Sequence, residues 1–223
     1  MKTEEEIKIP NATAKRIPLY YRYLKTLQES GVERIKSKEF SQLIQVPSAT
    51  IRRDFSHFGE LGRSGYGYDV SYLIEVFSNI LNTKVEKRIA LVGAGNLGKA
   101  LLNNNFRRNE NLNIVCAFDA NPEMIGQKIN GVTVRPMSDM KELVRKEGIT
   151  TAISTVPSSH SQEVVDQIVD SGITAILNFA PGRVKVPEQV KIQYIDLTTE
   201  LQTLIYMDEN FTSRKHFNFS NQD

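Results

Sequence analysis

Three glycines, at positions 93, 95 and 98, form the motif with the most specific chemistry in this chain. They lie in the run Gly93-Ala94-Gly95-Asn96-Leu97-Gly98, which follows the apolar residues 89–92 and precedes a helical pattern through Leu101 and Leu102. In a strand, turn and helix of this kind, the first glycine permits a tight turn, the second lets the backbone approach a pyrophosphate, and the third lets the helix pack on the strand. The helix N-terminus presents free N–H groups to the anion. The motif predicts a dinucleotide site.

A carboxylate follows at the end of the next predicted strand, 114–118. Asp119 comes 21 residues after Gly98, where a carboxylate hydrogen-bonds the adenosine ribose and repels a 2′-phosphate, so the predicted cofactor is NAD(H) rather than NADP(H). The stretch from Gly93 to Lys99 also approaches a P-loop, but residue 100 is Ala and offers no hydroxyl to Mg²⁺. A nucleoside triphosphate or acyl-CoA site and a purely structural glycine turn remain as alternatives.

Two further segments follow predicted strands at the same edge of the sheet. Thr155-Val156-Pro157 and Asn178-Phe179-Ala180-Pro181 come after buried strands, and ligands of parallel α/β sheets bind at this edge. Both segments are suited to cradling a nicotinamide without reacting. The predicted cofactor-binding residues are Gly93, Ala94, Gly95, Asn96, Leu97, Gly98, Asp119, Thr155, Val156, Pro157, Asn178 and Phe179.

Candidates for an acid or base beside the nicotinamide are few. His57 belongs to a basic helix, His216 to the C-terminal tail, and His160 opens a helix as a solvated first-turn residue. The pair Tyr21-x-x-x-Lys25 imitates a dehydrogenase motif, but it precedes the nucleotide fold and is explained by helix amphipathicity. We therefore predict neither a catalytic residue nor a metal ligand.

The N-terminal third has the pattern of a winged helix-turn-helix. Helices are expected over 13–30, from Ser37 to about 46, from Ser48 to 58, and over 70–81, with Ser37 and Ser48 as caps. Gly62 to Tyr68 is rich in glycine and suits a tight hairpin, or wing. The third helix presents a small, basic outer face suited to a major groove. The predicted DNA-binding residues are Ser48, Ala49, Thr50, Arg52, Arg53, Ser56, His57, Arg63 and Tyr66.

Charge is distributed unevenly along the chain. Residues 12–67 hold ten Lys and Arg against five Asp and Glu, whereas residues 86–223 hold 15 against 16. A basic unit attached to a neutral one is typical of polyanion binding. The longest charge-free runs fall far short of a membrane span, and the acidic start is unlike a signal peptide.

The rest of the chain alternates strands with helices. With 223 residues, 40% hydrophobic and 24% charged, it is globular, with one large domain or two small ones. After a polar joint at 84–88, buried strands are expected at 89–92, 114–118, 151–155, 174–179 and 192–195, in a parallel doubly wound sheet. A last helix is expected over 197–207, followed by a loosely held polar tail from 210. The single cysteine, Cys116, is expected to be an inert core residue, and its lack of a partner favours a reducing cytoplasm.

Several unlinked motifs, in one order, make the chain resemble the Rex family of redox-sensing transcriptional repressors along nearly its whole length. The matching segments are 9–16, 48–55, 57–59, 65–68, the glycine motif, 155–157, 176–179 and 195–202. The resemblance implies a homodimer that exchanges its last helix, binds a palindromic operator, and leaves it when NADH replaces NAD⁺. It also implies a switch in which Arg22 pairs with Asp196 across the dimer interface. Asn104 stands where the family has a tyrosine associated with sensing.

The predicted fold is α/β, with a winged helix-turn-helix domain (1–84), a Rossmann NAD(H)-binding domain (85–196) and a domain-swapped C-terminal dimerisation helix and tail (197–223). The predicted function is that of an NADH-responsive, cytoplasmic repressor of double-stranded operator DNA with no catalytic step. One alternative is an NAD-dependent oxidoreductase whose N-terminal helices serve packing or dimerisation. Another is a DNA-binding protein whose dinucleotide fold is a structural relic.

Overall fold

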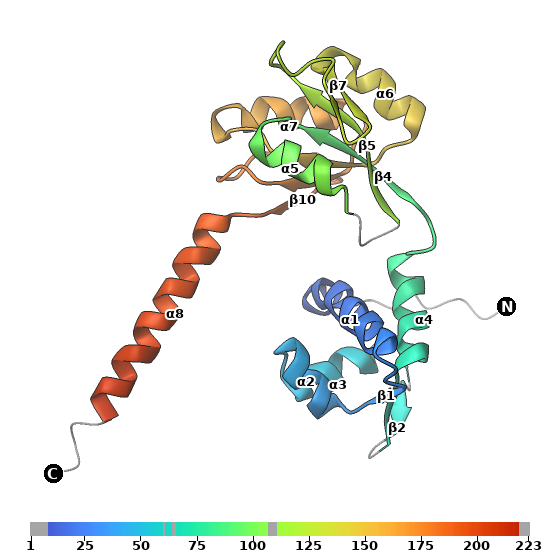
Figure 1. The fold of residues 1–223 in the computed structure, drawn as a ribbon, viewed down its shortest axis with the longest axis vertical. Coiled ribbons are helices and arrows are strands. Elements are labelled where there is room, and N and C mark those ends of the chain that lie inside the picture. Colours follow the sequence, from blue (N-terminus) through green and yellow to red (C-terminus); the bar gives the residue numbers. More distant parts are fainter. Residues whose placement is uncertain (1–8, 60, 64–65, 107–110, 219–223) are drawn as a thin grey trace. The chain divides into compact units, whose positions relative to one another are not determined.

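The computed structural model describes residues 9–59, 61–63, 66–106 and 111–218, with the backbone alone at 63 and 209–218. The chain separates into two compact units, residues 1–85 and 86–223, visible in Figure 1. The division of the sequence into three domains stays a prediction. No helix of the described residues is long and apolar enough to cross a membrane.

The N-terminal unit contains four helices and a small sheet within its described residues: α1 (Asn11–Glu29), β1 (Arg34–Ile35), α2 (Ser37–Ile44), α3 (Ser48–Ser56), β2 (Gly62–Arg63), β3 (Gly67–Asp69) and α4 (Val70–Leu81). The strands are antiparallel in the order β1-β3-β2. This arrangement confirms the predicted winged helix-turn-helix. Asp69 caps α4 by accepting the Tyr72 N–H at 2.9 Å.

The predicted serine caps are wrong by one residue. Ser37 and Ser48 are the first helical residues, and the extended residues before them are Lys36 and Pro47. Before α3, Pro47 holds φ at −53° and ψ at 135°, so the turn is complete before the serine is reached. Before α2, the carboxylate of Glu39 accepts the Lys36 N–H at 3.0 Å and serves the helix start instead.

Aromatic rings from every helix of this unit meet in its core. Tyr20, Phe40, Phe55 and Phe77 are almost fully buried, and Phe55 lies 5.4 Å from Tyr20 and 5.5 Å from Phe77 between ring centroids. The first pair is edge-to-face and the second is tilted, and aromatic pairs at this separation add to the stabilisation that burial provides. The inner face of α3 is therefore held by the rest of the unit.

A buried carboxylate fixes α3 against α1. Asp54 is 2% exposed; it accepts the Thr13 hydroxyl at 2.9 Å and the Arg16 guanidinium at 2.6 and 2.8 Å, and the Tyr20 hydroxyl donates to it as well. Burial opposes ionisation of Asp54, but hydrogen bonds from Arg16, Tyr20 and Thr13 outweigh it and hold the pKa of the carboxyl below its usual value. Burial and the bond to Asp54 raise the pKa of the Tyr20 phenol.

The C-terminal unit is built on a seven-stranded sheet in the order β10-β9-β8-β4-β5-β7-β6. All pairings are parallel except that of β6 with β7. Its helices and strands, apart from two short 3₁₀ turns, are β4 (Lys87–Val92), α5 (Asn96–Asn104), β5 (Leu112–Asp119), β6 (Lys128–Ile129), β7 (Val132–Pro136), α6 (Met140–Glu147), β8 (Thr151–Ser154), α7 (Ser161–Asp170), β9 (Ala175–Asn178), β10 (Lys191–Tyr194) and α8 (Leu197–Asn218). The doubly wound prediction is confirmed.

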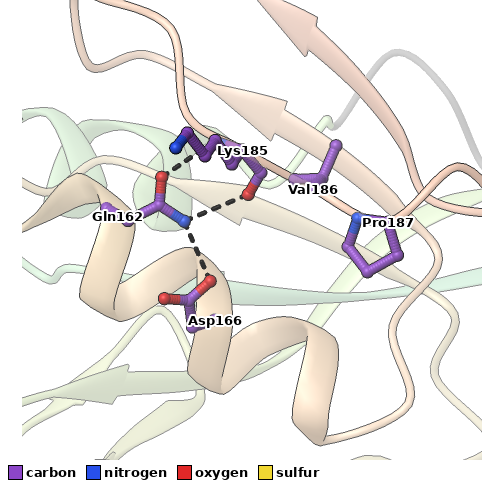
Figure 2. Close-up of a pocket in the computed structure, with 5 residues that line it drawn as sticks. All are labelled: Gln162, Asp166, Lys185, Val186 and Pro187. Carbon is purple, nitrogen blue, oxygen red and sulfur yellow. Dashed lines mark hydrogen bonds between the residues drawn. The ribbon is translucent and has the colours of Figure 1, made fainter.

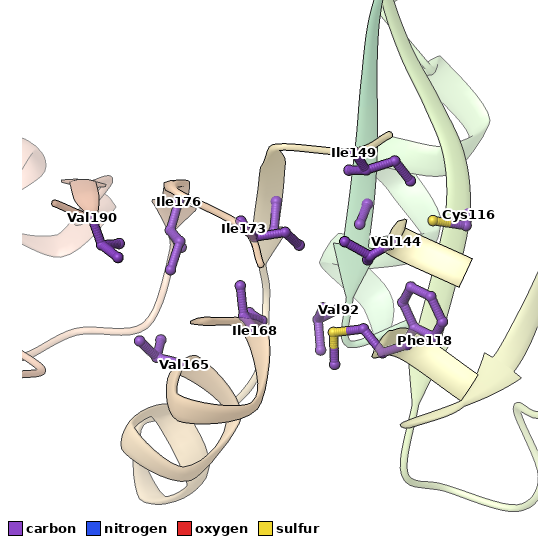
Figure 3. Close-up of a cluster of buried hydrophobic side chains, with 13 residues drawn as sticks. Val92, Cys116, Phe118, Val144, Ile149, Val165, Ile168, Ile173, Ile176 and Val190 are labelled. Atoms are coloured by element: carbon purple, nitrogen blue, oxygen red, sulfur yellow. The ribbon is translucent and has the colours of Figure 1, made fainter. Parts of the chain in front are cut away.

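Side chains alternate between two cores on the faces of this sheet. One face packs on α6 and α7, with Val92, Phe118 and Val144 among its members (Figure 3). The other packs on α5 through Leu102. Cys116 lies in the first core. Its burial is the main cause that raises the pKa of its thiol to about 12. The expectation of an inert core cysteine is confirmed, because only a thiolate reacts readily.

The last helix is longer than predicted. α8 runs to Asn218, so the expectation of a loose tail from 210 is wrong as far as that residue. Along α8, Leu201, Leu204, Ile205 and Met207 are exposed. Because a stripe of large apolar side chains at helical spacing is typical of a helix that packs on a partner, the exposed stripe is consistent with the expected dimerisation role.

Replacing Asp54 by Ala removes the anion that Arg16 and Tyr20 share. Because a buried charge left without its partner is costly, the free energy of unfolding of the N-terminal unit should fall by about 3 to 5 kcal/mol. Urea unfolding followed by circular dichroism measures this change. The matched control is Glu75→Ala, which removes an exposed carboxylate of the same unit and should cost less than about 0.5 kcal/mol.

The same variant tests the titration of Asp54. Because the pKa of Asp54 is lower in the folded chain than in the unfolded one, its contribution to stability is present above about pH 4 and is lost as the pH falls through the folded pKa. The parent should therefore lose stability below about pH 4 more steeply than Asp54→Ala. Equal acid dependence in the two proteins would contradict this role of Asp54.

Candidate functional site

The glycine turn after β4 is held by hydrogen bonds to both neighbouring strands. Gly93 has a φ of +96°, which glycine adopts without strain, and its N–H donates to the Phe118 carbonyl at 2.8 Å. The Thr155 hydroxyl donates to the Gly93 carbonyl at 2.6 Å. A Cβ on Gly93 would lie 3.0 Å from Val156. The turn is therefore fixed where the strand order reverses, between β5 and β8.

Gly98 and Gly95 have different structural roles. A Cβ on Gly98 would lie 2.0 Å from the carbonyl oxygen of Gly93, so only glycine lets α5 come this close to β4. Gly95 is the extended residue before α5 and carries no side-chain cap, and a Cβ there would meet no atom within 4 Å. The N-terminus of α5 thus opens onto free space, as an anion site at a helix start requires.

Asp119, the predicted partner of the ribose, also supports this turn. Its Oδ2 accepts the Ala94 N–H at 2.5 Å, and its Oδ1 accepts the Asn121 N–H at 2.8 Å. The side chain is half-buried. A carboxylate that accepts two backbone N–H groups has further lone pairs, so Asp119 can hold the turn and still accept ribose hydroxyls. The sequence did not reveal this structural role.

The segments after β8 and β9 complete the edge of the sheet. Thr155 and Val156 are half-buried and Pro157 is exposed, while the Phe179 N–H donates to the Ser154 carbonyl at 2.9 Å. Asn178 is fully buried; its amide donates to the Ser161 hydroxyl and accepts the Ala180 N–H. Its side chain therefore supports the loop rather than facing solvent, and direct contact with the cofactor stays a prediction.

A shallow hollow lies elsewhere on the unit, lined by Gln162, Asp166, Lys185, Val186 and Pro187. In Figure 2 the Gln162 amide bonds to the backbone N–H of Lys185 at 2.8 Å, to its carbonyl at 3.0 Å and to the Asp166 carboxylate at 2.9 Å. These bonds pin the loop after β9 to α7. The hollow contains none of the predicted cofactor residues, and its polar groups satisfy one another.

The outer face of α3 carries most of the predicted DNA contacts. Ala49, Arg52, Arg53 and Ser56 are exposed, whereas Ser48, Thr50 and His57 are half-buried. The Ser56 hydroxyl donates to the Arg53 carbonyl at 2.7 Å, so its other contacts are limited to accepting. Tyr66 is exposed on the wing; the side chain of Arg63 lies outside the described part of the chain.

Sequence reasoning missed the network beneath this face. Asp54 lies between Ile51 and Phe55, which are both buried, so a charged residue sat on the apolar face of a predicted helix. The position of Asp54 on the apolar face could have indicated the network, because a buried charge needs partners. Thr13, Arg16 and Tyr20 at helical spacing on α1 supply them.

The three predicted switch residues lie at the ends and surfaces of helices. Asp196 precedes α8 and accepts the N–H groups of Thr198 and Thr199 at 3.0 and 3.1 Å. The Thr199 hydroxyl, followed by these N–H groups, lowers the pKa of Asp196. Arg22 is exposed, with its guanidinium carbon 5.4 Å from the ring centroid of Tyr23. Asn104 is exposed at the end of α5.

No group of three His, Cys, Asp or Glu within the described ranges is placed to hold a metal ion. The glycine turn, the Asp119 carboxylate beside it and the basic α3 face are thus the features from which a function must be built.

Two protein families match the chain. The family described as CoA binding domain matches residues 84–182, and the family described as putative DNA-binding protein N-terminus matches residues 8–56. The redox-sensing transcriptional repressor Rex 2 of Enterococcus faecalis is 71% identical over 93% of this chain and 96% of its own. The redox-sensing transcriptional repressor Rex of Latilactobacillus sakei is 55% identical over 90% and 97%.

Solved structures agree with both units. The structure of RSP in complex with β-NAD⁺ and operator DNA has a TM-score of 0.84 and 32% identity, and covers 96% of this chain and 99% of its own. The structure of RSP in complex with β-NADH also has a TM-score of 0.84, with 31% identity and coverage of 94% and 99%. RSP is described as a Rex-family repressor.

Substitutions at Gly98 and Gly95 should separate folding from binding. Gly98→Ala forces a carbon against the Gly93 carbonyl, so the C-terminal unit should lose about 1 to 3 kcal/mol of unfolding free energy. Gly95→Val meets no protein atom at its Cβ, so it should fold like the parent within about 1 kcal/mol but block the pyrophosphate and weaken NADH. Urea unfolding and calorimetry measure the two effects. NADH affinity in Gly95→Val equal to that of the parent would show that the cofactor does not approach this turn.

Proposed function

This chain belongs to the Rex family of redox-sensing transcriptional repressors, and we propose that it represses transcription as a homodimer that binds operator DNA and releases it when NADH replaces NAD⁺. The observation that carries this proposal is that one chain holds both a winged helix with a basic outer face and a glycine turn held by the carboxylate of Asp119. Its relatives with the same two units include one solved with NAD⁺ and operator DNA and with NADH.

On the cofactor side, the residues present fit NAD(H). The open N-terminus of α5 at Gly95 suits the pyrophosphate, and Asp119 suits the adenosine ribose while disfavouring a 2′-phosphate. Thr155, Val156 and Phe179 line the edge where the nicotinamide would lie. When bound, the nicotinamide supplies the redox-sensitive ring, whose charge differs between NAD⁺ and NADH.

On the DNA side, α3 is the recognition helix in this proposal. Its exposed Ala49, Arg52, Arg53 and Ser56 face outward together, and Asp54 locks the opposite side to α1. A recognition helix held in this way presents its side chains to a major groove without reorganising first. A two-fold dimer then reads inverted half-sites.

Hydride transfer to a substrate is not part of the function. The relatives are named transcriptional repressors. The complexes of RSP with NAD⁺ and with NADH also argue against a dinucleotide fold that is only a structural relic. Because operator DNA is the target, we propose that the protein acts in the cytoplasm beside the chromosome.

The direct test is a titration of operator DNA, selected by the parent protein from randomised duplexes, with saturating NAD⁺ or NADH at one salt concentration. We expect tight binding with NAD⁺ and weaker binding with NADH. Equal operator affinity in the NAD⁺-bound protein and in the NADH-bound protein would remove redox sensing from the function.

The same titration assigns the recognition helix. Arg53→Ala should weaken operator binding by about 1 to 3 kcal/mol if Arg53 contacts guanine with two hydrogen bonds. The matched control is Arg145→Ala, which removes an exposed cation of α6 in the other unit. If Arg53→Ala bound the operator as tightly as Arg145→Ala, α3 would not be the reader.

We further propose that Arg22 and Asp196 pair across the dimer interface in one of its two states, and that Asn104 weakens the NADH response relative to a tyrosine. In support, Arg22 is exposed and hydrogen bonds from Thr198 and Thr199 keep the Asp196 carboxylate ionised. Because the Asp196 side chain is already ordered as the cap of α8, pairing with Arg22 would cost little further conformational entropy. A ligand shifts such an equilibrium only through its different affinities for the two states.

Two substitutions at one position separate the cap from the switch. Asp196→Asn keeps an acceptor for the N–H groups of α8, so the unfolding free energy should stay within about 0.5 kcal/mol, but it removes the charge that Arg22 needs. The NADH-induced change in operator affinity should therefore shrink in both Asp196→Asn and Asp196→Ala. A full response in Asp196→Asn would leave Asp196 as a cap alone.

A further inference from the structure

Arg34, on the short strand β1, is a cation of the N-terminal unit to which no role has yet been assigned. Its guanidinium carbon lies 4.0 Å from the ring centroid of Tyr66, at the wing between β2 and β3. This is closer than the stacks of Arg183 on Tyr194, at 4.6 Å, and Arg22 on Tyr23, at 5.4 Å. Arg34 is exposed and forms no ion pair with a carboxylate among the described residues. Its charge is thus available to a ligand.

The backbone holds this pair in place. β1 joins β3 with Arg34 opposite Asp69 and Ile35 opposite Tyr68, so the stack sits on a hydrogen-bonded sheet. Gly67 has a φ of +82°, and a Cβ there would lie 2.9 Å from the Ile35 carbonyl. Only glycine lets the wing lie this close to β1. The cation and the ring are therefore parts of one local framework.

Nearby carboxylates are occupied by helix starts rather than by Arg34. Asp69 accepts the Tyr72 N–H at the start of α4, and Glu39 accepts the Lys36 N–H at the start of α2. The exposed cations Arg34, Lys36 and Lys38 outnumber the exposed carboxylates of the same segment, those of Glu33 and Glu39. The segment is therefore a basic edge beside the wing.

Stacking also determines which part of the guanidinium a ligand meets. The Tyr66 ring covers one side of the guanidinium, so a ligand can approach Arg34 only from the uncovered side, and a planar fork of N–H donors suits the oxygens of a phosphate. Tyr66 remains 66% exposed under its arginine, so much of its ring is open to pack on a sugar. A cation and an aromatic surface at one point match the backbone of a nucleic acid.

We propose that Arg34, stacked on Tyr66, is a DNA-binding residue that grips a backbone phosphate beside the groove entered by the wing. The contact lies outside the recognition helix and carries no sequence information; it adds affinity for duplex DNA of any sequence. This inference rests on the proposed function, since it assigns a second contact to the same DNA.

The salt dependence of DNA binding tests the phosphate contact. For the dimeric parent, Arg34→Gln should weaken both the selected operator and a scrambled duplex by a similar factor, about five- to tenfold per subunit. The slope of log K against log salt should become shallower by about 1 per subunit. The control, Arg145→Gln, removes one exposed cation from the C-terminal unit and should leave the slope unchanged.

A double-mutant cycle tests the stack. Tyr66→Leu should weaken binding when Arg34 is present and should add little to Arg34→Gln, because the ring orients the guanidinium. Arg34→Lys should keep the slope but lose affinity, since an ammonium lacks the planar fork. Additive losses in the cycle would overturn the stacked arrangement.

The outcomes are distinguishable from those of the proposed function. If the parent fails to bind the operator, the proposed function fails. If the parent binds and Arg34→Gln keeps its slope and affinity, or loses affinity for the operator alone, the phosphate contact is overturned while the repressor function stands. Thermal unfolding of each variant like that of the parent confirms that the comparison is made between folded proteins.

Discussion

The approach of α5 to the first turn of the sheet is the constraint on which the C-terminal unit depends. Gly98 lies so near the Gly93 carbonyl that a single added carbon would come within 2.0 Å of it. That contact sets where α5 begins, and the Thr155 hydroxyl and the Asp119 carboxylate then fix the turn from its two sides. The residues expected to bind the cofactor are therefore also the residues that build the turn. A ligand at this edge would therefore contact the framework of the unit itself, as the proposed sensing requires.

The N-terminal unit solves a different problem with a buried charge. A recognition helix must expose its polar face while its other face stays fixed, and α3 has only nine residues from Ser48 to Ser56. Phe55 anchors it in the aromatic core, and Asp54 ties it to three side chains of α1. Hydrogen-bonded charges have a narrow range of acceptable geometries, so this network orients the helix more strictly than apolar contacts alone would. The wing is held separately, through Gly67 and β1.

Local patterns predicted the parts of the molecule that local physics controls. The helix over 70–81 and five of the strands after residue 84 follow from periodicity and from the glycine motif. The hairpin of β6 and β7 was missed although Asn130 and Gly131, both with positive φ, form a typical two-residue turn and β7 alternates between buried and exposed residues. Its other strand, β6, has only two residues and shows no pattern. The network around Asp54 could not be predicted in detail, since its members are up to 41 residues apart and meet only after the helices pack. The length of α8 was underestimated because the sequence of its polar end lacks the apolar periodicity from which a helix is predicted.

The central claim is that one protein links the cofactor turn to operator affinity. The exposed stripe of α8, with Leu201 and Leu204, gives the expected dimer an apolar surface through which such a link can pass. Linkage demands reciprocity: if NADH weakens the operator complex by some factor, the operator must weaken NADH binding by the same factor. The most direct measurement is calorimetric titration of NADH into the protein alone and into its operator complex, beside the DNA titrations with and without NADH. If the cofactor turn controls operator affinity, the two factors should be equal and greater than one; an NADH affinity unchanged by bound operator would show that the two sites are not coupled.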